Sequence, residues 1–253
     1  IGLSAGIYQY TVTDMNGCSQ SDTITINQST SLYTSLVVSN YNGNNISCNG
    51  LTDGFIDIQV NGGTLPYAYY FNDTLITNPS VSGLAAGTYT DSIVDANGCV
   101  FTETITLTEP AMLNSVLSVI NVSCNGGNDG SITVTATGGT PGYTYTWSDG
   151  QTTATASGLY AGVYSVLIAD ANGCSVLVTA TISEPTQIVI SLDSLTNVTV
   201  YGGNDGALFT SAYGGASSGG ASSFTYQWTG PSLFSASTPN ISNLVAGTYW
   251  CTV

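Results

Sequence analysis

The chain has 253 residues, with 15 acidic side chains and no Lys, Arg or His, so its formal net charge is −15 at pH 7. Nucleic-acid binding and polybasic attachment to membranes both require Lys or Arg, so both are excluded. Hydrophobic residues make up 42% of the chain and charged residues only 6%, which is enough to build cores and argues against a disordered acidic tail. No apolar run is long enough for a membrane-spanning helix, so direct membrane insertion is not expected.

Two groups of motifs recur along the chain and divide it into repeats. The closing motif is Leu-x-Ala-Gly-x-Tyr, followed after its first three copies by Asp-x-Asn-Gly-Cys. The opening motif is Cys-Asn-Gly-x-x-Asp-Gly, and its aspartates Asp53, Asp129 and Asp205 are 76 residues apart at each step. This spacing predicts the C-terminal half of a repeat (1–30), complete repeats at 31–110 and 111–185, and a truncated repeat (186–253). We expect such a chain to be an internal stretch of a longer polypeptide.

Within each repeat, apolar and polar residues alternate in short runs between turn residues, which is typical of β-strands. About seven short strands in some 75 residues predict an all-β fold of tandem immunoglobulin-like or PKD-like β-sandwich repeats, each of about 75–85 residues. In the second repeat we expect, in chain order, strands at Leu113–Val122, Ser131–Ala136 and Tyr143–Trp147, a polar edge strand at Thr152–Ala156, and a hairpin of Val163–Ala169 and Cys174–Ile182.

Two kinds of aromatic residue are expected to stabilise each sandwich. An aromatic side chain on the third strand, Phe71, Trp147 or Trp228, is predicted to lie in the core. The tyrosine of the closing motif fits a tyrosine corner, in which the phenol bonds back to the preceding turn. The four corner tyrosines would be Tyr8, Tyr89, Tyr164 and Tyr249.

Six cysteines in such a composition indicate an extracellular protein with disulfides. Nearly equal separations favour pairing within a repeat, as Cys48–Cys99 and Cys124–Cys174. A second arrangement stays open: if Cys48 lies at the opposite pole of its sandwich from the Asp-x-Asn-Gly-Cys turn, the bridges link neighbouring repeats instead. Two cysteines are expected to have no partner within the chain: Cys18, whose partner would precede it, and Cys251, a buried free thiol.

Together, the opening motif, the Gly-Gly-Thr-x-x-Tyr run and the closing motifs resemble SprB-type repeats, which occur in very large cell-surface adhesins of gliding bacteria. The resemblance covers essentially the whole chain. It implies export by the type IX secretion system, attachment at the outer membrane, a role in gliding motility, and contact with external surfaces or polysaccharides. Contact with the outer-membrane gliding and secretion machinery would come from regions outside this chain. The third repeat departs from the pattern, because Val200 replaces the opening cysteine and Ser217–Ser223 are inserted.

The sequence predicts no enzyme. Without His, nucleophilic triads cannot be built, and the aspartates recur at equivalent positions, whereas a catalytic carboxylate pair would be singular. Calcium is the one cofactor considered, because it takes oxygen ligands. Alternatively, these aspartates accept backbone N–H bonds in turns and no cofactor is bound. The candidate ligands are Asp53, Asp129 and Asp205 before the second strand of each repeat, and Asp14, Asp95 and Asp170 in the hairpin turns.

The leading interpretation is a stiff, protease-resistant stalk of sandwiches joined by short Glu-Pro linkers, in which Pro restricts the residue before it. The alternative is a glycan-binding repeat with exposed tyrosines such as Tyr67, Tyr69, Tyr70, Tyr143 and Tyr145. Four Asp-Ser/Thr-aliphatic triplets also resemble the O-glycan acceptor of bacteria with type IX export. Their hydroxyl residues are Thr23, Thr74, Ser92 and Ser194.

Overall fold

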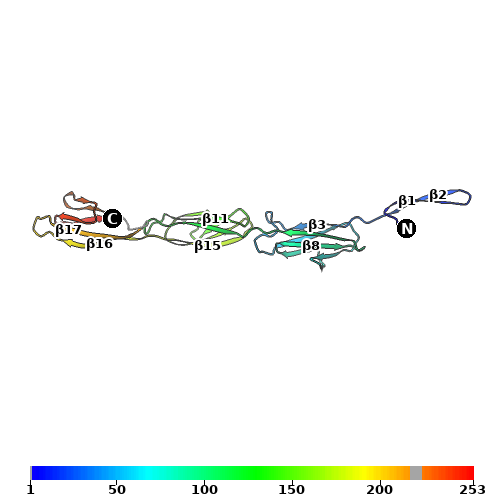
Figure 1. Cartoon of the computed structure of the whole chain (residues 1–253), viewed down its shortest axis with the longest axis horizontal. Helices are drawn as coiled ribbons and strands as arrows, with labels where there is room; N and C mark the ends of the chain where they lie inside the picture. The colour runs from blue at the N-terminus through cyan, green and yellow to red at the C-terminus, as the bar shows by residue number, and fades with distance from the viewer. Residues whose placement is uncertain (1, 217–223) are drawn as a thin grey trace. The chain divides into compact units, whose positions relative to one another are not determined.

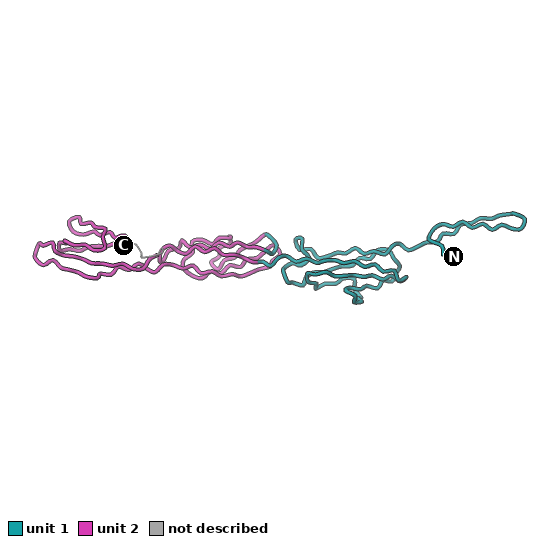
Figure 2. The backbone as a smooth tube through the Cα atoms, in the orientation of Figure 1, with its two compact units in different colours: residues 1–113, 138–141 teal, residues 114–137, 142–253 magenta. Residues whose placement is uncertain are grey.

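The structure is a computed structural model that describes residues 2–216 and 224–253 (Figure 1). The predicted insertion at Ser217–Ser223 lies outside the described residues. The described residues form β-strands and one 3-10 turn, Pro231–Leu233, and contain no α-helix. The chain divides into two compact units, residues 1–113 with 138–141 and residues 114–137 with 142–253 (Figure 2).

The first unit contains a hairpin and one complete sandwich. The hairpin is a separate two-stranded sheet of β1 (Gly6–Thr13) and β2 (Ser19–Ile26). Ile56, Ile93 and Leu107 are fully buried between the two sheets of the sandwich. One sheet has the order β3-β4-β7, from Tyr33–Val38, Gly54–Asn61 and Ser80–Leu84, and the other has the order β6-β5-β8-β9, from Thr74–Ile76, Ala68–Phe71, Gly87–Val94 and Val100–Leu107.

The second repeat, in the second unit, has the same plan. Its sheets have the orders β10-β11-β13 and β12-β14-β15. These correspond to the A-B-E and C-F-G strands of an immunoglobulin domain, so the predicted fold class is confirmed. Ile132, Trp147, Val166 and Ile168 are among its buried core residues. The strands are β10 (Asn114–Ile120), β11 (Gly130–Thr137), β12 (Thr144–Trp147), β13 (Thr155–Leu159), β14 (Gly162–Ala169) and β15 (Ser175–Ile182).

The edge strand predicted at Thr152–Ala156 is displaced, because β13 spans Thr155–Leu159. The backbone just before it is engaged by the core tryptophan: the indole Nε1 of Trp147 donates to the carbonyl oxygen of Thr153 at 2.9 Å. The strand therefore begins after this contact and continues to Leu159, whose side chain is buried.

The third repeat is also in the second unit. Its first sheet is β16-β17-β20, and its second sheet is β19-β18-β21. By the motif alignment β21 corresponds to β8 and β14, but the described residues of this repeat include no strand equivalent to β9 or β15. Among the described residues, β21 pairs with β18. The strands are β16 (Thr186–Thr196), β17 (Gly206–Gly215), β18 (Gln227–Thr229), β19 (Ser235–Ala236), β20 (Ile241–Leu244) and β21 (Trp250–Thr252).

Candidate functional site

The Asp-x-Asn-Gly-Cys motif forms the tight turn between the last two strands of a repeat. In the first repeat, Oδ1 of Asp95 accepts the backbone N–H of Asn97 at 2.9 Å and of Cys99 at 2.8 Å, while its Oδ2 accepts the N–H of Thr64 at 2.9 Å. Gly98 takes a φ of 78°, which the turn requires and L side chains rarely adopt. The turns at Asp14 and Asp170 have the same Oδ1 bonds.

The opening-motif aspartates close the loop before the second strand. Oδ1 of Asp53 accepts the N–H of Ser47, Oδ1 of Asp129 that of Ser123, and Oδ1 of Asp205 that of Thr199, at 3.0 to 3.1 Å. Hydrogen bonds from the hydroxyl and N–H of Ser123 hold the pKa of Asp129 below its ordinary value, and those of Thr199 do the same for Asp205. The pKa of Asp95 is lowered in the same way, first by the N–H of Cys99.

Each of the six candidate calcium ligands makes its hydrogen bonds in a loop or turn of its own. There each carboxylate accepts backbone N–H bonds. Those in the hairpin turns do so as the first residue of the turn, the arrangement expected of Asp there. Within residues 2–216 and 224–253, no group of three or more His, Cys, Asp or Glu side chains is placed to hold a metal ion. The geometry thus accounts for these aspartates through backbone hydrogen bonding.

The opening loop also forms hydrogen bonds with the Glu-Pro linker, a contact that the sequence did not predict. In the first repeat, Oε2 of Glu109 accepts the N–H of Gly50 at 2.6 Å, and Nδ2 of Asn49 donates to the carbonyl oxygen of Pro110 at 3.1 Å. We call this pair of contacts the linker clamp. The second repeat repeats it with Gly126 to Glu184 at 2.6 Å and Asn125 to Pro185 at 3.1 Å. The sequence did show that Asn-Gly and Glu-Pro recur in each complete repeat. It could not show that the two dipeptides are in contact, because they meet only in the folded sandwich.

The predicted disulfides within repeats are wrong. Cys99 and Cys124 are exposed free thiols, and the disulfide-bonded cysteines are Cys48 and Cys174. In the first repeat, Cys99 immediately precedes β9, whereas the loop that carries Cys48 contacts the residues after β9. Eight strand residues at about 3.3 Å each separate the two ends by about 26 Å, whereas a disulfide requires Cα atoms within about 7 Å.

The second repeat shows the same separation. Cys124 directly precedes Asn125, which donates to the carbonyl oxygen of Pro185 after the end of β15, whereas Cys174 immediately precedes the start of β15. Opening cysteines and hairpin cysteines therefore lie at opposite poles of each sandwich, the arrangement under which a pair within one repeat cannot form. Cys18 is also an exposed free thiol, and Cys251 is a half-buried free thiol whose pKa is raised by desolvation.

One acidic pair lies in the interior of the first repeat. Asp91 on β8 is 1% exposed, and neither of its carboxylate oxygens has a hydrogen-bond partner. Its cross-strand neighbour on β9 is Glu103, which accepts a hydrogen bond from the hydroxyl of Thr34 on β3. Burial, reinforced by the charge of Glu103, raises the pKa of Asp91 to about 6. The equivalent pair in the second repeat is Val166 and Val178, so an acidic pair is not a requirement of the fold.

The tyrosines serve mainly as structural residues. Each corner tyrosine donates its phenol O–H to the carbonyl oxygen four residues earlier, at distances of 2.8 to 3.2 Å. Tyr67 and Tyr69 pack against the core of the first repeat, and Tyr143 and Tyr145 against that of the second. Phe71, Trp147 and Trp228 are buried on the third strands, as the sequence predicts.

The four O-glycan acceptor candidates differ in accessibility. Thr23, Thr74 and Ser194 are exposed. Ser92 is half-buried and its neighbour Asp91 lies in the core, so an enzyme that reads the Asp-Ser pair could not reach it in the folded repeat.

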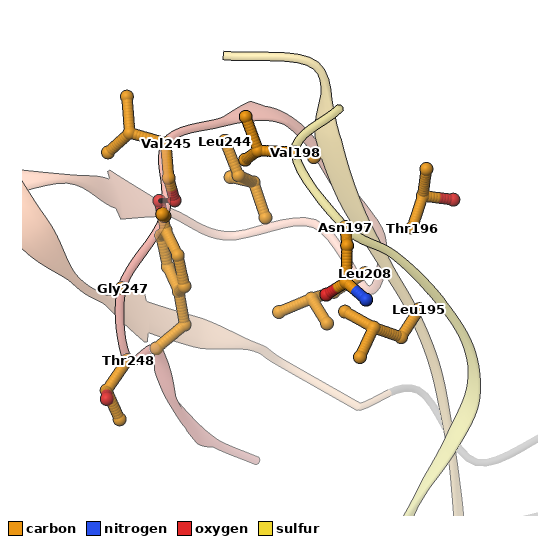
Figure 3. Close-up of a pocket in the computed structure, with 12 residues that line it drawn as sticks. Leu195, Thr196, Asn197, Val198, Leu208, Leu244, Val245, Gly247 and Thr248 are labelled. Atoms are coloured by element: carbon orange, nitrogen blue, oxygen red, sulfur yellow. Dashed lines mark hydrogen bonds between the residues drawn. The ribbon is translucent and has the colours of Figure 1, made fainter. Parts of the chain in front are cut away.

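The third repeat contains an open groove of about 520 Å³, lined by Val198, Gly206, Leu208, Leu244 and Tyr249 among others (Figure 3). In the complete repeats the corresponding space is filled by the last residue of the final strand. A Cβ added to Gly54 would meet Cδ1 of Leu107 at 3.1 Å, and one added to Gly130 would meet Cγ2 of Ile182 at 3.0 Å. In the third repeat the equivalent glycine, Gly206, lines the groove.

The fold defines a class of protein: a tandem array of immunoglobulin-like β-sandwich repeats. The family model described as SprB repeat matches residues 40–74 and 117–152, so the chain contains two SprB-type repeat segments. Proteins with these repeats are cell-surface proteins. No curated protein matches the chain.

Two solved structures are similar to the chain. One contains three N-terminal domains of the bacteriophage RB49 Highly Immunogenic Outer Capsid protein (Hoc), with 15% identity and a TM-score of 0.41, and the match covers 83% of this chain and 80% of that one. The other contains Sidekick-1 immunoglobulin domains 1–5, with 13% identity and a TM-score of 0.35, covering 98% of this chain and 63% of that one. In the part of the chain that the structure describes, no helix meets the length and apolarity needed to span a membrane.

Proposed function

We propose that this chain is a stalk segment of a very large secreted cell-surface adhesin, and that it transmits load and projects an adhesive region. The observation that supports this most directly is the linker clamp. A Glu-Pro linker already has restricted backbone freedom, and the clamp fixes it to the sandwich through a charge-assisted bond to Gly50 or Gly126. Each complete repeat therefore fixes the beginning of the linker that follows its last strand.

The chemistry of the chain also suits a structural role. Its recurring carboxylates are engaged in turns and loops, and its aromatic side chains in cores and corners. These contacts of residues 2–216 and 224–253 suit a structural role and not catalysis. We therefore propose that the segment is not an enzyme and needs no cofactor. Attachment at the outer membrane, type IX export, gliding motility, O-glycans at exposed Thr23, Thr74 and Ser194, and contact of the adhesin with external surfaces or polysaccharides are parts of the same proposal.

Force measurement on single molecules tests the load-bearing role. Stretched from its termini under reducing conditions, which open the disulfides of Cys48 and Cys174, the chain should show a separate unfolding event for each complete sandwich. Glu184→Ala combined with Asn125→Ala removes both contacts of the clamp of the second repeat and should lower the force of one event. Asp149→Asn is the matched control, because Asp149 is exposed and bonds only to Gln151 in its own turn. Equal forces in the clamp variant and the control would contradict the proposed role of the clamp.

A binding assay separates the stalk from the glycan-binding alternative. All the candidate tyrosines except Tyr70 pack against cores, so we expect no retention of the chain on immobilised polysaccharides. Saturable retention that is lost on replacement of Tyr70 would favour the glycan-binding function. Antibody against the chain should label intact source cells; labelling only after permeabilisation would contradict the surface location.

A further inference from the structure

A hydroxyl from the opposite sheet touches the acidic pair of the first repeat. Thr34 lies on β3 and Glu103 on β9, and these are edge strands of the two different sheets. Oγ1 of Thr34 is in direct contact with Oε1 of Glu103. The carboxyl carbon of Glu103, Cδ, is one bond from that oxygen, so the hydroxyl lies beside a carbon that it can attack.

Asp91 places a second carboxyl group at the same position. It is directly opposite Glu103 in the β8–β9 pair, is 1% exposed and has no hydrogen-bond partner. Burial and then the charge of Glu103 raise the pKa of Asp91, and the hydroxyl of Thr34 partly offsets the rise, so the three side chains are close together. A buried carboxyl group without a partner is costly, and such an exception calls for an explanation.

We propose that Thr34 and Glu103 join in a side-chain ester bond, which forms in the folded repeat with Asp91 as the proton carrier. Oγ1 of Thr34 attacks Cδ of Glu103, which is in its protonated form, and the hydroxyl proton passes to the carboxylate of Asp91. Asp91 then gives this proton to the departing hydroxyl group of Glu103, which leaves as water. One C–O bond forms and one breaks, Asp91 is unchanged, and no co-reactant is needed.

The folded repeat supplies the conditions that this condensation needs. In bulk water an ester hydrolyses because the solvent is concentrated, but two groups held in the right geometry react with an effective concentration of about 10⁵–10⁸ M. Esterification also removes a carboxylate charge from beside the buried Asp91, where two like charges are unfavourable. The chain has no Lys, so a lysine amide cross-link is not available to it.

The second repeat retains the hydroxyl but has neither carboxyl group. By the strand registers, Ser115 of β10 corresponds to Thr34 of β3. Val166 and Val178 occupy the positions of the acidic pair. Oγ of Ser115 is buried and has no hydrogen-bond partner. The second repeat therefore has no carboxyl group with which this hydroxyl can react, and it serves as an internal control.

The bond would join the first and last strands of the first repeat. Load applied to the chain would then pass from β3 through the ester to β9, and the residues between Thr34 and Glu103 would bear none of it. Because the bond forms only after folding, freshly refolded chain begins without it and gains it with time. Force and stability measurements on the first repeat without the bond therefore use freshly refolded chain or Thr34→Val.

Mass spectrometry of the full 253-residue chain tests the bond directly. Chain that is purified in denaturant and then refolded should lose one water with time, whereas chain kept in denaturant should not. Chymotryptic peptides that contain Thr34 and Glu103 should then be recovered as one cross-linked species, which mild alkali separates. Absence of this species after refolding, or a loss of water located at an Asp-Gly dipeptide such as Asp53-Gly54, would overturn the proposal.

Variants identify the role of each group. Thr34→Val removes the nucleophile and should abolish the cross-link, whereas Thr34→Ser keeps a hydroxyl and should retain it. Asp91→Asn, and Asp91→Val, a residue that the fold accepts in the second repeat, should each slow its formation about 10²-fold or more. Ser115→Ala is the matched control and should leave the rate unchanged.

The rate of cross-linking should also depend on pH, because the reaction needs one proton on the acidic pair. Burial raises the pKa of Asp91 to about 6, so the rate should fall about tenfold for each pH unit above that value. A cross-link that persists in Thr34→Val would overturn the assignment of the nucleophile. A rate that neither pH nor the Asp91 variants alter would overturn the assignment of the proton carrier.

Discussion

Replacing Asp91 by Val should stabilise the first repeat at neutral pH. Asp91 is buried, has no hydrogen-bond partner and faces Glu103 across the β8–β9 pair, which together raise its pKa from 3.8 to about 6. A difference of about two pH units, at 1.36 kcal/mol per unit, corresponds to about 3 kcal/mol. Because the equivalent residue in the second repeat is the buried Val166, the fold accepts Val at this position.

The sign of the pH dependence follows from linkage. The folded state binds the Asp91 proton more tightly than the unfolded state, so this contribution to stability is complete below the unfolded pKa of about 4 and is lost as pH rises through about 6. The first repeat should therefore be more stable at pH 5 than at pH 7. In Asp91→Val that difference should disappear, and the variant should exceed the wild type at pH 7 by about 2–3 kcal/mol.

Hydrogen exchange monitored by mass spectrometry resolves the repeats, so it is the assay of choice. Peptides from β8 and β9 report the first repeat, and peptides from β14 and β15 provide an internal reference in the same sample. Val166→Asp is the reciprocal variant and should confer the same pH dependence on the second repeat. If wild-type exchange in β8 is equal at pH 5 and 7 after correction for intrinsic rates, or if Asp91→Val fails to slow it at pH 7, the reasoning is refuted.

Three further predictions concern the turns and corners. Asp170→Ala removes the acceptor for the N–H groups of Asn172 and Cys174, and should destabilise the β14–β15 hairpin by about 1–3 kcal/mol, measured by hydrogen exchange; unchanged exchange would contradict the role of the turn. Tyr164→Phe removes the corner bond to Tyr160 and should cost about 1 kcal/mol in denaturant unfolding, with Tyr201→Phe, which is fully exposed, as the neutral control. Calcium or a chelator should leave the melting temperature unchanged, because backbone N–H groups already occupy the aspartates; a calcium-dependent rise would favour a metal site.

Much of the fold could be predicted because its signals are local. Alternation of apolar and polar residues located the strands of the second repeat, and the position of the closing tyrosine placed Tyr164 at a corner. The Asp-x-Asn-Gly turn follows from the chemistry of its own residues, since a carboxylate at the first position accepts N–H bonds and Gly98 supplies a positive φ. Asp91 could also have been found, because alternation places it inward, like Val166.

The disulfide prediction was wrong because it depended on the positions of the cysteines in the folded repeat. Equal separations in sequence cannot tell whether two cysteines share a pole, and Cys48 and Cys99 are separated by the length of β9. The linker clamp escaped prediction for the related reason that Asn49 and Pro110 meet only when the two ends of a repeat lie at the same pole.

By itself, the sequence determined the repeat spacing, the strand pattern, the turn chemistry and the lack of any basic side chain, because each of these depends on residue type and short-range order. Only the tertiary structure decided which pole each cysteine occupies, what the opening loop binds, and which carboxylate lies unpartnered in a core. Those properties depend on distances between residues far apart in the chain, and packing of the two sheets sets those distances.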